Sequence, residues 1–349
     1  DDQLSLAFLS DSALSTLLQK LEAMKPRAIG LNVYRDYSSP PQLAKRLSET
    51  NNLFFICKVP SAGAPGIAPP PEVPLERVGF SDFVLDSDAV ARRHLLGMSP
   101  PSTSPCQARN AFSLLLALKY LNNEGTEVKT NSDGHLEIGQ SPLTRLGSNF
   151  GSYSGIDARG YQIFLNYRNS GVNKQFSQVS LRNVLSDSIE PANIRGRIVL
   201  VGMARDGSPG GLSDGFLTPY NTDRFDQQEI PGVFIQAHMV SQLISAVLDN
   251  RPLIRSWPAW AESLWLLSWA FIGGGVVYVV NLRRNSYLYW FRFLSGGLIG
   301  GLIVESSLFS VCYVLLLQGY WVPWIPSSIA IIVTMGCMVA YFQRQRTEY

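Results

Sequence analysis

Apolar sequence near the C-terminus constrains this 349-residue chain more than any other feature. No charged residue lies in Ser263–Val280, and Glu305 is the only one in Phe293–Phe342. A helix needs about 20 apolar residues to cross the hydrocarbon core of a bilayer. The first run therefore predicts one membrane span. The second predicts two spans, near Phe293–Leu317 and Val322–Phe342, joined by a tight hairpin, so we expect this end of the chain to lie in the lipid bilayer.

Charge is divided unevenly about Trp257. Before it lie 24 Lys or Arg and 24 Asp or Glu, and after it lie five and three. The first part is therefore a net-neutral globular domain that is long enough for a sizeable core. We predict two domains, residues 1–257 and residues 258–349. The balanced charge argues against a nucleic-acid partner, because nucleic-acid binding depends on a basic field.

Arginines near the predicted spans set the orientation. They lie between the first two spans and after the third, at Arg283, Arg284, Arg292, Arg344 and Arg346, whereas the second hairpin carries no charge. Basic residues mark the cytoplasmic side of a membrane. We therefore predict a multi-pass protein of the inner (plasma) membrane, with a cytoplasmic C-terminus and residues 1–257 outside, in the periplasm. A domain outside needs an export device, so we expect a signal peptide or another span upstream of Asp1.

The four cysteines fall into two pairs. Cys312 and Cys337 lie in the apolar runs, where a thiol usually acts as a small apolar side chain. Cys57 and Cys106 lie in the predicted outer domain, without the C-x-x-C spacing of metal or redox sites. Two alternatives stay open for the second pair, a single disulfide or two free thiols.

Two features of the predicted spans are candidates for function or packing. Glycines recur at small-xxx-small spacing, at Gly296, Gly297, Gly300 and Gly301, which lets helices approach closely. They predict either packing among the three spans or a homodimer seam. Glu305 lies in the middle of a span, where a carboxylate is costly. It is either a functional group or a protonated side chain that bonds a neighbouring helix.

Apolar periodicity in residues 1–257 alternates between helix and strand. The predicted helices are Ser12–Met24 (capped by Asp11), Gln42–Leu47, Ala111–Leu121, Val179–Leu185 and Val233–Leu248. The predicted strands are Arg27–Tyr34, Leu53–Val59, Phe80–Leu85, Val90–Met98, Tyr161–Tyr167 and Arg197–Gly202. This alternation predicts an α/β extracytoplasmic domain with a mostly parallel or mixed sheet, followed by three C-terminal transmembrane α-helices. Residues 122–160 are rich in Gly, Ser and Asn and predict an elaborated insertion.

Ligand contacts are expected where the strands end, because ligands of open α/β sheets bind beyond the carboxyl ends of the strands. The candidate ligand-binding residues are Gly202, Asp214, Thr218, His238, Arg35 and Asp36. Each has a structural alternative: an Asp before Thr-Pro anchors turns, a lone helical His is often a packed side chain, and the Arg-Asp pair is then a local ion pair.

Motifs of catalysis are missing from the sequence. It contains no G-x-S-x-G elbow, no phosphate-binding glycine loop and no metal-ligand spacing of its three histidines. We therefore predict no catalytic residue, no metal and no cofactor. An extracytoplasmic enzyme that uses Asp214 or His238 is the weakest hypothesis.

Several segments, taken together, resemble the extracytoplasmic sensor domain called CHASE, type two. They are Pro26–Asp36, Gly79–Asp82, Ala91–Arg93, Ile194–Gly202, Asp214 with Thr218-Pro219, and Ile230–His238. Asn32 stands where the family usually has Asp, and the loop from Ala204 to Gly215 is longer and richer in glycine.

The resemblance implies the input module of a bacterial, often cyanobacterial, receptor, in which three spans follow the sensor. Such receptors carry a nucleotide cyclase, histidine kinase or Ser/Thr kinase on the cytoplasmic side. The expected partner is an unknown small molecule or protein outside the cell. The alternative is an assembly subunit of a membrane complex, in which the outer domain is a docking surface.

Overall fold

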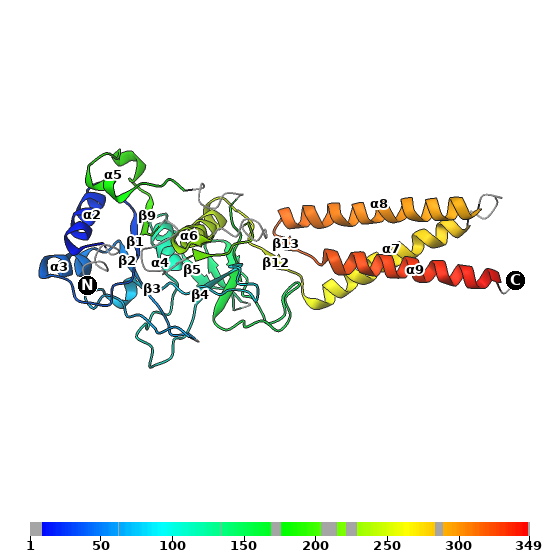
Figure 1. The fold of residues 1–349 in the computed structure, drawn as a ribbon, viewed down its shortest axis with the longest axis horizontal. Helices are drawn as coiled ribbons and strands as arrows, with labels where there is room; N and C mark the ends of the chain where they lie inside the picture. Colours follow the sequence, from blue (N-terminus) through cyan, green and yellow to red (C-terminus); the bar gives the residue numbers. More distant parts are fainter. Residues whose placement is uncertain are drawn as a thin grey trace. The chain divides into compact units, whose positions relative to one another are not determined.

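The protein divides into two compact units in a computed structural model of the chain. The α/β unit contains Asp1–Leu146 and Ala158–Leu253, and the helical unit contains Gly147–Asp157 and Ile254–Tyr349. The structure describes residues 9–61, 63–132, 134–168, 176–203, 215–220, 229–282 and 289–347. Figure 1 shows the helices and strands of both units.

A parallel four-stranded sheet forms the centre of the α/β unit. Its strands are β1 (Ala28–Asn32), β2 (Leu53–Cys57), β3 (Val78–Phe80) and β9 (Ile198–Gly202), in the order β3-β2-β1-β9. Apolar side chains fill these strands because both faces of the sheet are covered, and β2 is buried throughout. The predicted α/β fold with a parallel sheet is confirmed.

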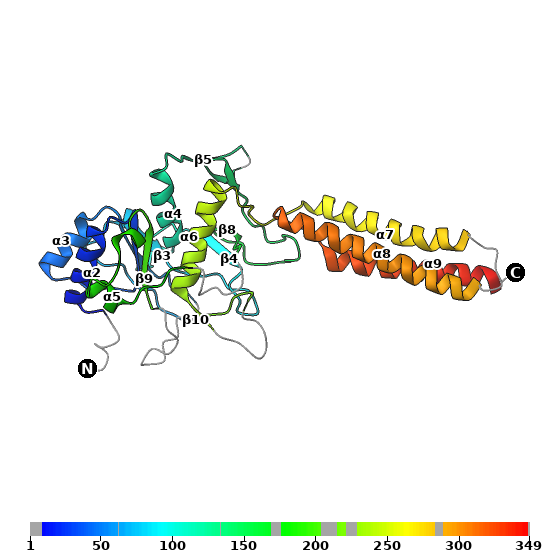
Figure 2. The same ribbon diagram turned by 90° about the horizontal axis from the view of Figure 1, so that it is seen from above.

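Helices cover both faces of the sheet (Figures 1 and 2). On one face lie α2 (Asp11–Ala23), α3 (Pro41–Glu49) and α5 (Leu181–Leu185), and on the other lie α4 (Phe112–Asn122) and α6 (Gly232–Leu248). The buried side of α2 carries its apolar residues at helical spacing, Leu14, Leu17, Leu18 and Leu21. The cap of α2 is Ser10, whose Oγ accepts from the Ala13 amide at 3.3 Å, so the prediction of Asp11 as the cap was wrong.

Glycine allows α4 to lie directly on the sheet. A Cβ on Gly79 of β3 would lie 2.3 Å from Cα of Phe112, which no neighbouring side chain can relieve because the contact is with backbone. Phe112 itself is fully buried. The backbone of β3 at Gly79 therefore lies so close to the first turn of α4 that no side chain fits between them.

A disulfide joins the end of β2 to the segment before α4. Cys57 and Cys106 are bonded, with 5.4 Å between their Cα atoms, and both side chains are fully buried. This finding decides between the two alternatives that the sequence left open. The bond anchors the proline-rich loop that follows β2 to a second segment on the same edge of the sheet.

Smaller sheets complete the α/β unit. Strands β4 (Arg93–Gly97) and β8 (Tyr161–Phe164) pair antiparallel. The segment predicted as an elaborated insertion contains a three-stranded antiparallel sheet of β5 (Val128–Thr130), β6 (Leu136–Ile138) and β7 (Ser141–Leu143). The sequence pattern did not indicate these strands, because strands of three residues are too short to show a period of two. Among the other described pairs, β10 (Gly215–Phe216) lies antiparallel to β11 (Ile230–Pro231).

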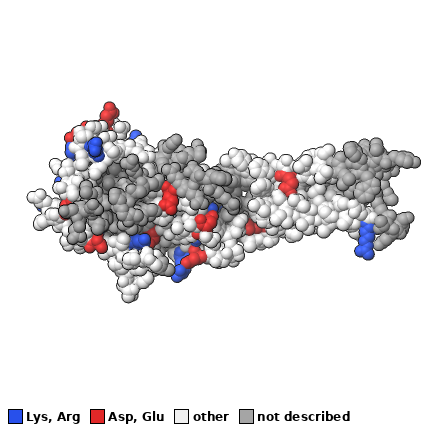
Figure 3. All heavy atoms as spheres, viewed as in Figure 1, with Lys and Arg blue, Asp and Glu red and all other residues white. Residues whose placement is uncertain are grey.

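Three long helices dominate the helical unit. They are α7 (Ala259–Leu282), α8 (Tyr289–Leu317) and α9 (Trp324–Thr347), and each is long and apolar enough to cross a membrane. Strand β12 (Arg255–Ser256), before α7, pairs in parallel with β13 (Tyr320–Trp321), between α8 and α9. In the face shown, the helical unit is nearly free of charged side chains, whereas charges of both signs lie on the α/β unit (Figure 3).

Candidate functional site

The carboxyl edge of the sheet collects polar side chains from the ends of two strands, β1 and β3. Asn32 and Gly202 end β1 and β9 and are paired with each other in the sheet. Beyond β1, the Tyr34 hydroxyl shares a hydrogen bond of 2.8 Å with Ser81 Oγ, which lies just beyond β3. The carboxylate of Asp82 accepts from a backbone amide after β2, and burial raises the pKa of Asp82. This edge is the place where the sequence predicted a ligand.

Arg35 is a buried side chain that is already well supplied with partners. Its NH1 donates to Asp11 at 2.8 Å and to the Tyr37 hydroxyl at 3.0 Å, and its NH2 donates to Ser39 at 2.9 Å. The carboxylate that pairs with Arg35 thus belongs to Asp11, at the start of α2. The adjacent Asp36 is exposed and is not the partner. The contacts tie α2 to the segment that follows β1.

The other predicted ligand residues do not all meet at this edge. Gly202 lies there, and Thr218 is fully buried beside a backbone bridge from Leu217 to Val90. Asp214 lies outside the described residues. His238 lies in the second turn of α6, buried, at the end of β8. The structure therefore separates His238 from the Arg35 segment and links it to a second cluster.

That second cluster is centred on Tyr167, just after β8. The ring of Tyr167 lies 5.2 Å from the ring of His238, whose Nδ1 accepts from the backbone amide of Arg168 at 3.3 Å. The Tyr167 hydroxyl donates to the carbonyl oxygen of Ala91 at 2.8 Å, and burial raises the pKa of Tyr167. Tyr167 thus joins α6 to the segment that carries the two arginines described next.

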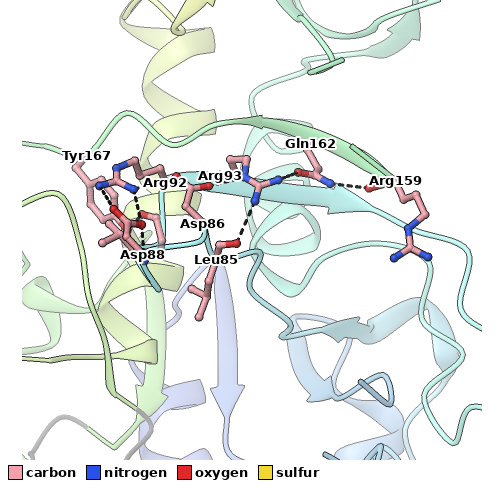
Figure 4. A network of polar contacts seen from close by, with 10 residues as sticks. Leu85, Asp86, Asp88, Arg92, Arg93, Arg159, Gln162 and Tyr167 are labelled. Atoms are coloured by element: carbon pink, nitrogen blue, oxygen red, sulfur yellow. Dashed lines mark hydrogen bonds and ion pairs between the residues drawn. The ribbon is translucent and has the colours of Figure 1, made fainter. Parts of the chain in front are cut away.

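Arg92 and Arg93 share one carboxylate (Figure 4). Arg93 Nε donates to Asp86 at 2.8 Å, and Arg92 reaches the other oxygen of Asp86 at 3.0 Å and also binds Asp88. The remaining nitrogens of Arg93 donate to Gln162 at 3.0 Å and to the Leu85 carbonyl at 3.0 Å. Arg93 and Asp86 are both buried, so this is a charge pair that the fold satisfies internally.

The chain leaves the α/β unit through residues that are bonded to the Tyr167 cluster. Arg251 NH2 donates to the Tyr167 carbonyl at 2.8 Å and to Asn166 Oδ1 at 3.0 Å. Asn166 Nδ2 in turn donates to the carbonyl of Pro252 at 3.1 Å. The segment between α6 and the first long helix is therefore attached to the end of β8.

A Ser-His pair in the core has the atoms of a nucleophile and a base but no access to a substrate. His94 Nε2 lies 2.8 Å from Ser113 Oγ, and both side chains are fully buried. Burial lowers the pKa of His94 to about 3, so the ring is neutral at physiological pH. The pair is a structural hydrogen bond. Within the described ranges, no three His, Cys, Asp or Glu side chains are grouped as metal ligands.

The family model for the CHASE2 domain matches residues 2–275. The chain belongs to the CHASE2 family. A CHASE2 domain is an extracellular sensory domain, so the chain contains a sensory input module. No curated protein and no solved structure matches the chain.

The segments that resemble the family lie together in the CHASE2 domain. They supply β1 and β9 of the sheet, the Ser81-Asp82 turn, the arginine pair of Figure 4 and the first half of α6. The match reaches into α7, and three helices in this chain are apolar enough to be membrane spans. The sequence and the comparison agree on a membrane protein with a sensory domain, and no catalytic domain is detected.

Helices α8 and α9 are joined by Glu305. Its Oε2 accepts from Ser328 Oγ at 2.7 Å. A Cβ on Gly300 would lie 2.5 Å from Val276 of α7, and one on Gly301 would lie 3.1 Å from Met335 of α9. These two glycines therefore face helices of the same chain.

The other two glycines of the motif give less information. A Cβ on Gly297 would meet no atom within 4 Å, and the surroundings of Gly296 lie outside the described residues. A homodimer seam stays a prediction.

The residues around the exit of the CHASE2 domain were missed at the sequence level. No pattern in the sequence singles out Asn166, Arg168 or Arg251. Nothing in the pattern joins them, because Arg251 and Tyr167 lie 84 residues apart. The loop Gly147–Asp157 belongs to the helical unit, and its sequence shows no apolar period from which this could be predicted.

Proposed function

We propose that this chain is the extracytoplasmic sensory input and the transmembrane transducer of a bacterial signalling receptor. The output, a cyclase or a kinase, would act on the cytoplasmic side. The domain 1–257 would receive an unknown small molecule or protein, and the region 258–349 would carry the change across the inner membrane.

The observation that carries this proposal is the attachment of the connecting segment on both of its sides. In the α/β unit, Arg251 and Pro252 are bonded to Asn166 and Tyr167. In the helical unit, the amide of Arg255 donates to the carbonyl of Gly319 at 2.8 Å. Only a short piece of chain separates these anchors, so a shift at the end of β8 acts on the membrane helices without a slack linker.

Aromatic contacts strengthen the attachment of Arg255 to the hairpin between α8 and α9. The Arg255 guanidinium lies 4.3 Å over the ring of Tyr320, which also faces Trp257 at 6.5 Å. Cation–π and aromatic contacts of this kind are each worth about 0.5–1 kcal/mol at exposed sites. They connect the start of α7 with the hairpin between α8 and α9. All three helices are therefore attached to the segment that leaves the sensory domain.

Two independent observations support an outer location of residues 1–257. The arginines near the spans favour a cytoplasmic C-terminus. The disulfide of Cys57 and Cys106 is of a kind that persists in oxidising compartments and is rare in the cytosol. The cysteines of the helical unit, Cys312 and Cys337, are free thiols.

Orientation is tested by single-cysteine labelling of intact cells with an impermeant maleimide. Cys312 and Cys337 are first replaced by Ser, and Asp36→Cys or Gln345→Cys is then introduced, since both positions are exposed. The cysteine at 36 should react in intact cells and the one at 345 only after permeabilisation. The reverse pattern would overturn the proposal.

Transduction is tested with spin labels at Val279→Cys and Gln345→Cys, near the far ends of α7 and α9, in the same serine background. Asn166→Ala removes the bonds to Arg251 and Pro252. We expect it to change the distance distribution between the two labels in lipid nanodiscs.

The matched control is insertion of two glycines between Leu253 and Ile254, which lengthens the connection but leaves both sets of bonds. In this background, Asn166→Ala should no longer alter the distance. If Asn166→Ala has no effect in the native chain, the domain does not act on the spans. The assembly-subunit function would then be favoured, and co-purification of a stoichiometric partner would support it.

A further inference from the structure

Two arginines meet where the chain leaves the CHASE2 domain. Arg168 follows β8, and Arg251 follows α6. Arg251 NH2 donates to the carbonyl of Tyr167, which is bonded directly to the nitrogen of Arg168. Burial lowers the pKa of Arg251, and the nearby charge of Arg168 lowers it further. Two positive side chains are therefore close enough to repel each other.

Among the residues that the structure describes, only neutral oxygens accept hydrogen bonds from these two guanidinium groups. Arg168 Nε donates to Ser241 Oγ at 2.6 Å, and Arg251 NH2 donates to a carbonyl and to the Asn166 side chain. Among the described residues, no carboxylate lies within ion-pair distance of either side chain. Arg251 NH1 is buried and has no partner there, and no hydrogen bond joins NH1 or NH2 of Arg168 to a described residue.

Other partly buried arginines of this unit are satisfied differently. Arg35 pairs with Asp11, and Arg46 pairs with Glu22. Arg77 has no ion pair, but four backbone carbonyls at and after the end of α3 accept from it. Such carbonyls carry the negative end of the helix dipole. The pair at the domain exit lacks both kinds of counter-charge in the described part of the chain.

We propose that Arg168 and Arg251 form a binding site for an oxyanion, that is, a carboxylate, phosphate or sulfate group. Arg168 is anchored through Nε and Arg251 through NH2, which leaves NH1 and NH2 of Arg168 and the buried NH1 of Arg251 without a described partner. Guanidinium nitrogens match the spacing of oxyanion oxygens. An oxyanion supplies the missing counter-charge to both groups at once.

The surroundings suit a ligand with an anionic group and an apolar part. Tyr220 contributes to the electrostatic environment of Arg251. Its ring lies edge-on to that of Tyr167 at 6.2 Å and is 48% exposed. The third nearby arginine, Arg92, is held by Asp86 and Asp88 and is not available in the same way.

The same oxyanion chemistry has two sources, a soluble ligand and a lipid phosphate. Arg251 precedes the first residue of α7, Ala259, by eight residues, which span at most about 28 Å. Experiments must therefore separate the two sources. If the proposed transducer function holds, an oxyanion on Arg251 also acts on the bonds that hold the connecting segment.

The test uses the purified full chain in an uncharged detergent. Its affinity for inorganic phosphate, sulfate and citrate is measured by isothermal titration, with chloride at matched ionic strength as the reference. We expect at least one of these oxyanions to bind to the native chain. Arg168→Gln and Arg251→Gln should each weaken that binding by about tenfold or more, because each removes charge-assisted hydrogen bonds to the ligand.

Control variants separate the site from general charge. Arg195→Gln removes an exposed arginine elsewhere in the domain and should leave the affinity unchanged. Arg168→Lys keeps the positive charge but loses the paired N–H donors of the guanidinium group. It should bind the oxyanion more weakly than the native chain. If Arg251→Gln fails to fold, Arg168→Gln still tests the site, because its side chain has one bond to the described residues.

Nanodiscs provide the lipid arm. The thermal unfolding of the native chain and of Arg168→Gln is measured in nanodiscs of phosphatidylglycerol and in nanodiscs of phosphatidylcholine. A stabilisation that depends on Arg168 and on the anionic lipid would identify a lipid phosphate as the source. Equal affinity of native and variant chains for every oxyanion, together with equal stability in both lipids, would overturn the site.

The outcome is distinguishable from a failure of the proposed function. Oxyanion binding that leaves the spin-label distances of α7 and α9 unchanged would confirm the site and contradict transduction. A change in the spin-label distance with Asn166→Ala, in a chain that binds no oxyanion, would support transduction and contradict the oxyanion site.

Discussion

The indole of Trp321 lies edge-on against the ring of Tyr153, with 5.9 Å between the ring centroids. Tyr153 belongs to the loop Gly147–Asp157, which leaves the sequence of the α/β unit to join the helical unit. Gly151 of this loop has φ +57°, and a Cβ there would lie 2.9 Å from the indole. The hairpin between α8 and α9 is thus covered by a loop that precedes it by more than 160 residues.

Removal of either ring of this pair should destabilise the helical unit. Edge-to-face pairs contribute about 0.5–1.5 kcal/mol beyond the area that they bury. We expect a coupling energy of that size in a double-mutant cycle of Tyr153→Ala and Trp321→Ala, measured by thermal unfolding in detergent. Tyr153→Phe is the control and should retain the coupling. Additive single effects would show that the rings do not interact.

Arg93 should matter more for stability than its neighbour Arg92. Arg93 is buried with Asp86, so Arg93→Ala leaves a buried carboxylate with less compensation and should cost roughly 3–5 kcal/mol. The side chains of Arg92 and Asp88 are 32% and 52% exposed, so we expect Arg92→Ala to cost about 1 kcal/mol or less. Pulse proteolysis in urea measures both. Equal costs would contradict the buried pair as the main contributor.

Acid should destabilise the CHASE2 domain through His94. Its pKa is about 3 in the folded protein, whereas an unfolded chain takes up that proton near pH 6.5. The stability from neutral His94 is therefore present above pH 6.5 and is lost as the pH falls from 6.5 towards 3, at roughly 1.4 kcal/mol per pH unit. His94→Gln should flatten the fall in melting temperature over this range. His135→Gln, at a less buried histidine, should not flatten it.

Loss of the disulfide should weaken the sensory domain. A covalent link between Cys57 and Cys106, which are 49 residues apart, restricts the unfolded chain and typically contributes 2–4 kcal/mol. We expect the double change to Ala to lower the free energy of unfolding by about that amount. The change of Cys312 and Cys337 to Ser is the control. An unaltered stability of the first variant would mean that the bond is not formed in the cell.

Local patterns in the sequence predicted the elements whose packing is regular. α2 carries its buried leucines at helical spacing, whereas β1 and β9 are short apolar runs and α6 is a longer one, so the existence of these elements followed from their apolar patterns. The partner of Arg35 was beyond reach, because Asp11 approaches it only through the packing of α2 on the sheet. The same holds for Arg251 and Tyr167.

The predicted hairpin after β3 shows how geometry changes a pattern. The sequence suggested strands over Phe80–Leu85 and Val90–Met98, whereas β3 ends at Phe80 and only Val84 bridges to Arg93. The intervening residues turn away from the sheet to supply Asp86 and Asp88 to the arginines. Ion pairs with two arginines at the start of β4, which a period of apolar residues does not record, hold this segment.

The contact of Gly79 with Phe112 limits how the sensory domain can respond to a stimulus. Because α4 and β3 already touch through their backbones, no guest molecule fits between these two layers, and the helix cannot sink further toward the strand. The position of α4 relative to β3 is therefore fixed by their contact. Under the proposed transducer function, a conformational change that reaches the membrane helices should therefore leave this contact intact and begin elsewhere in the domain.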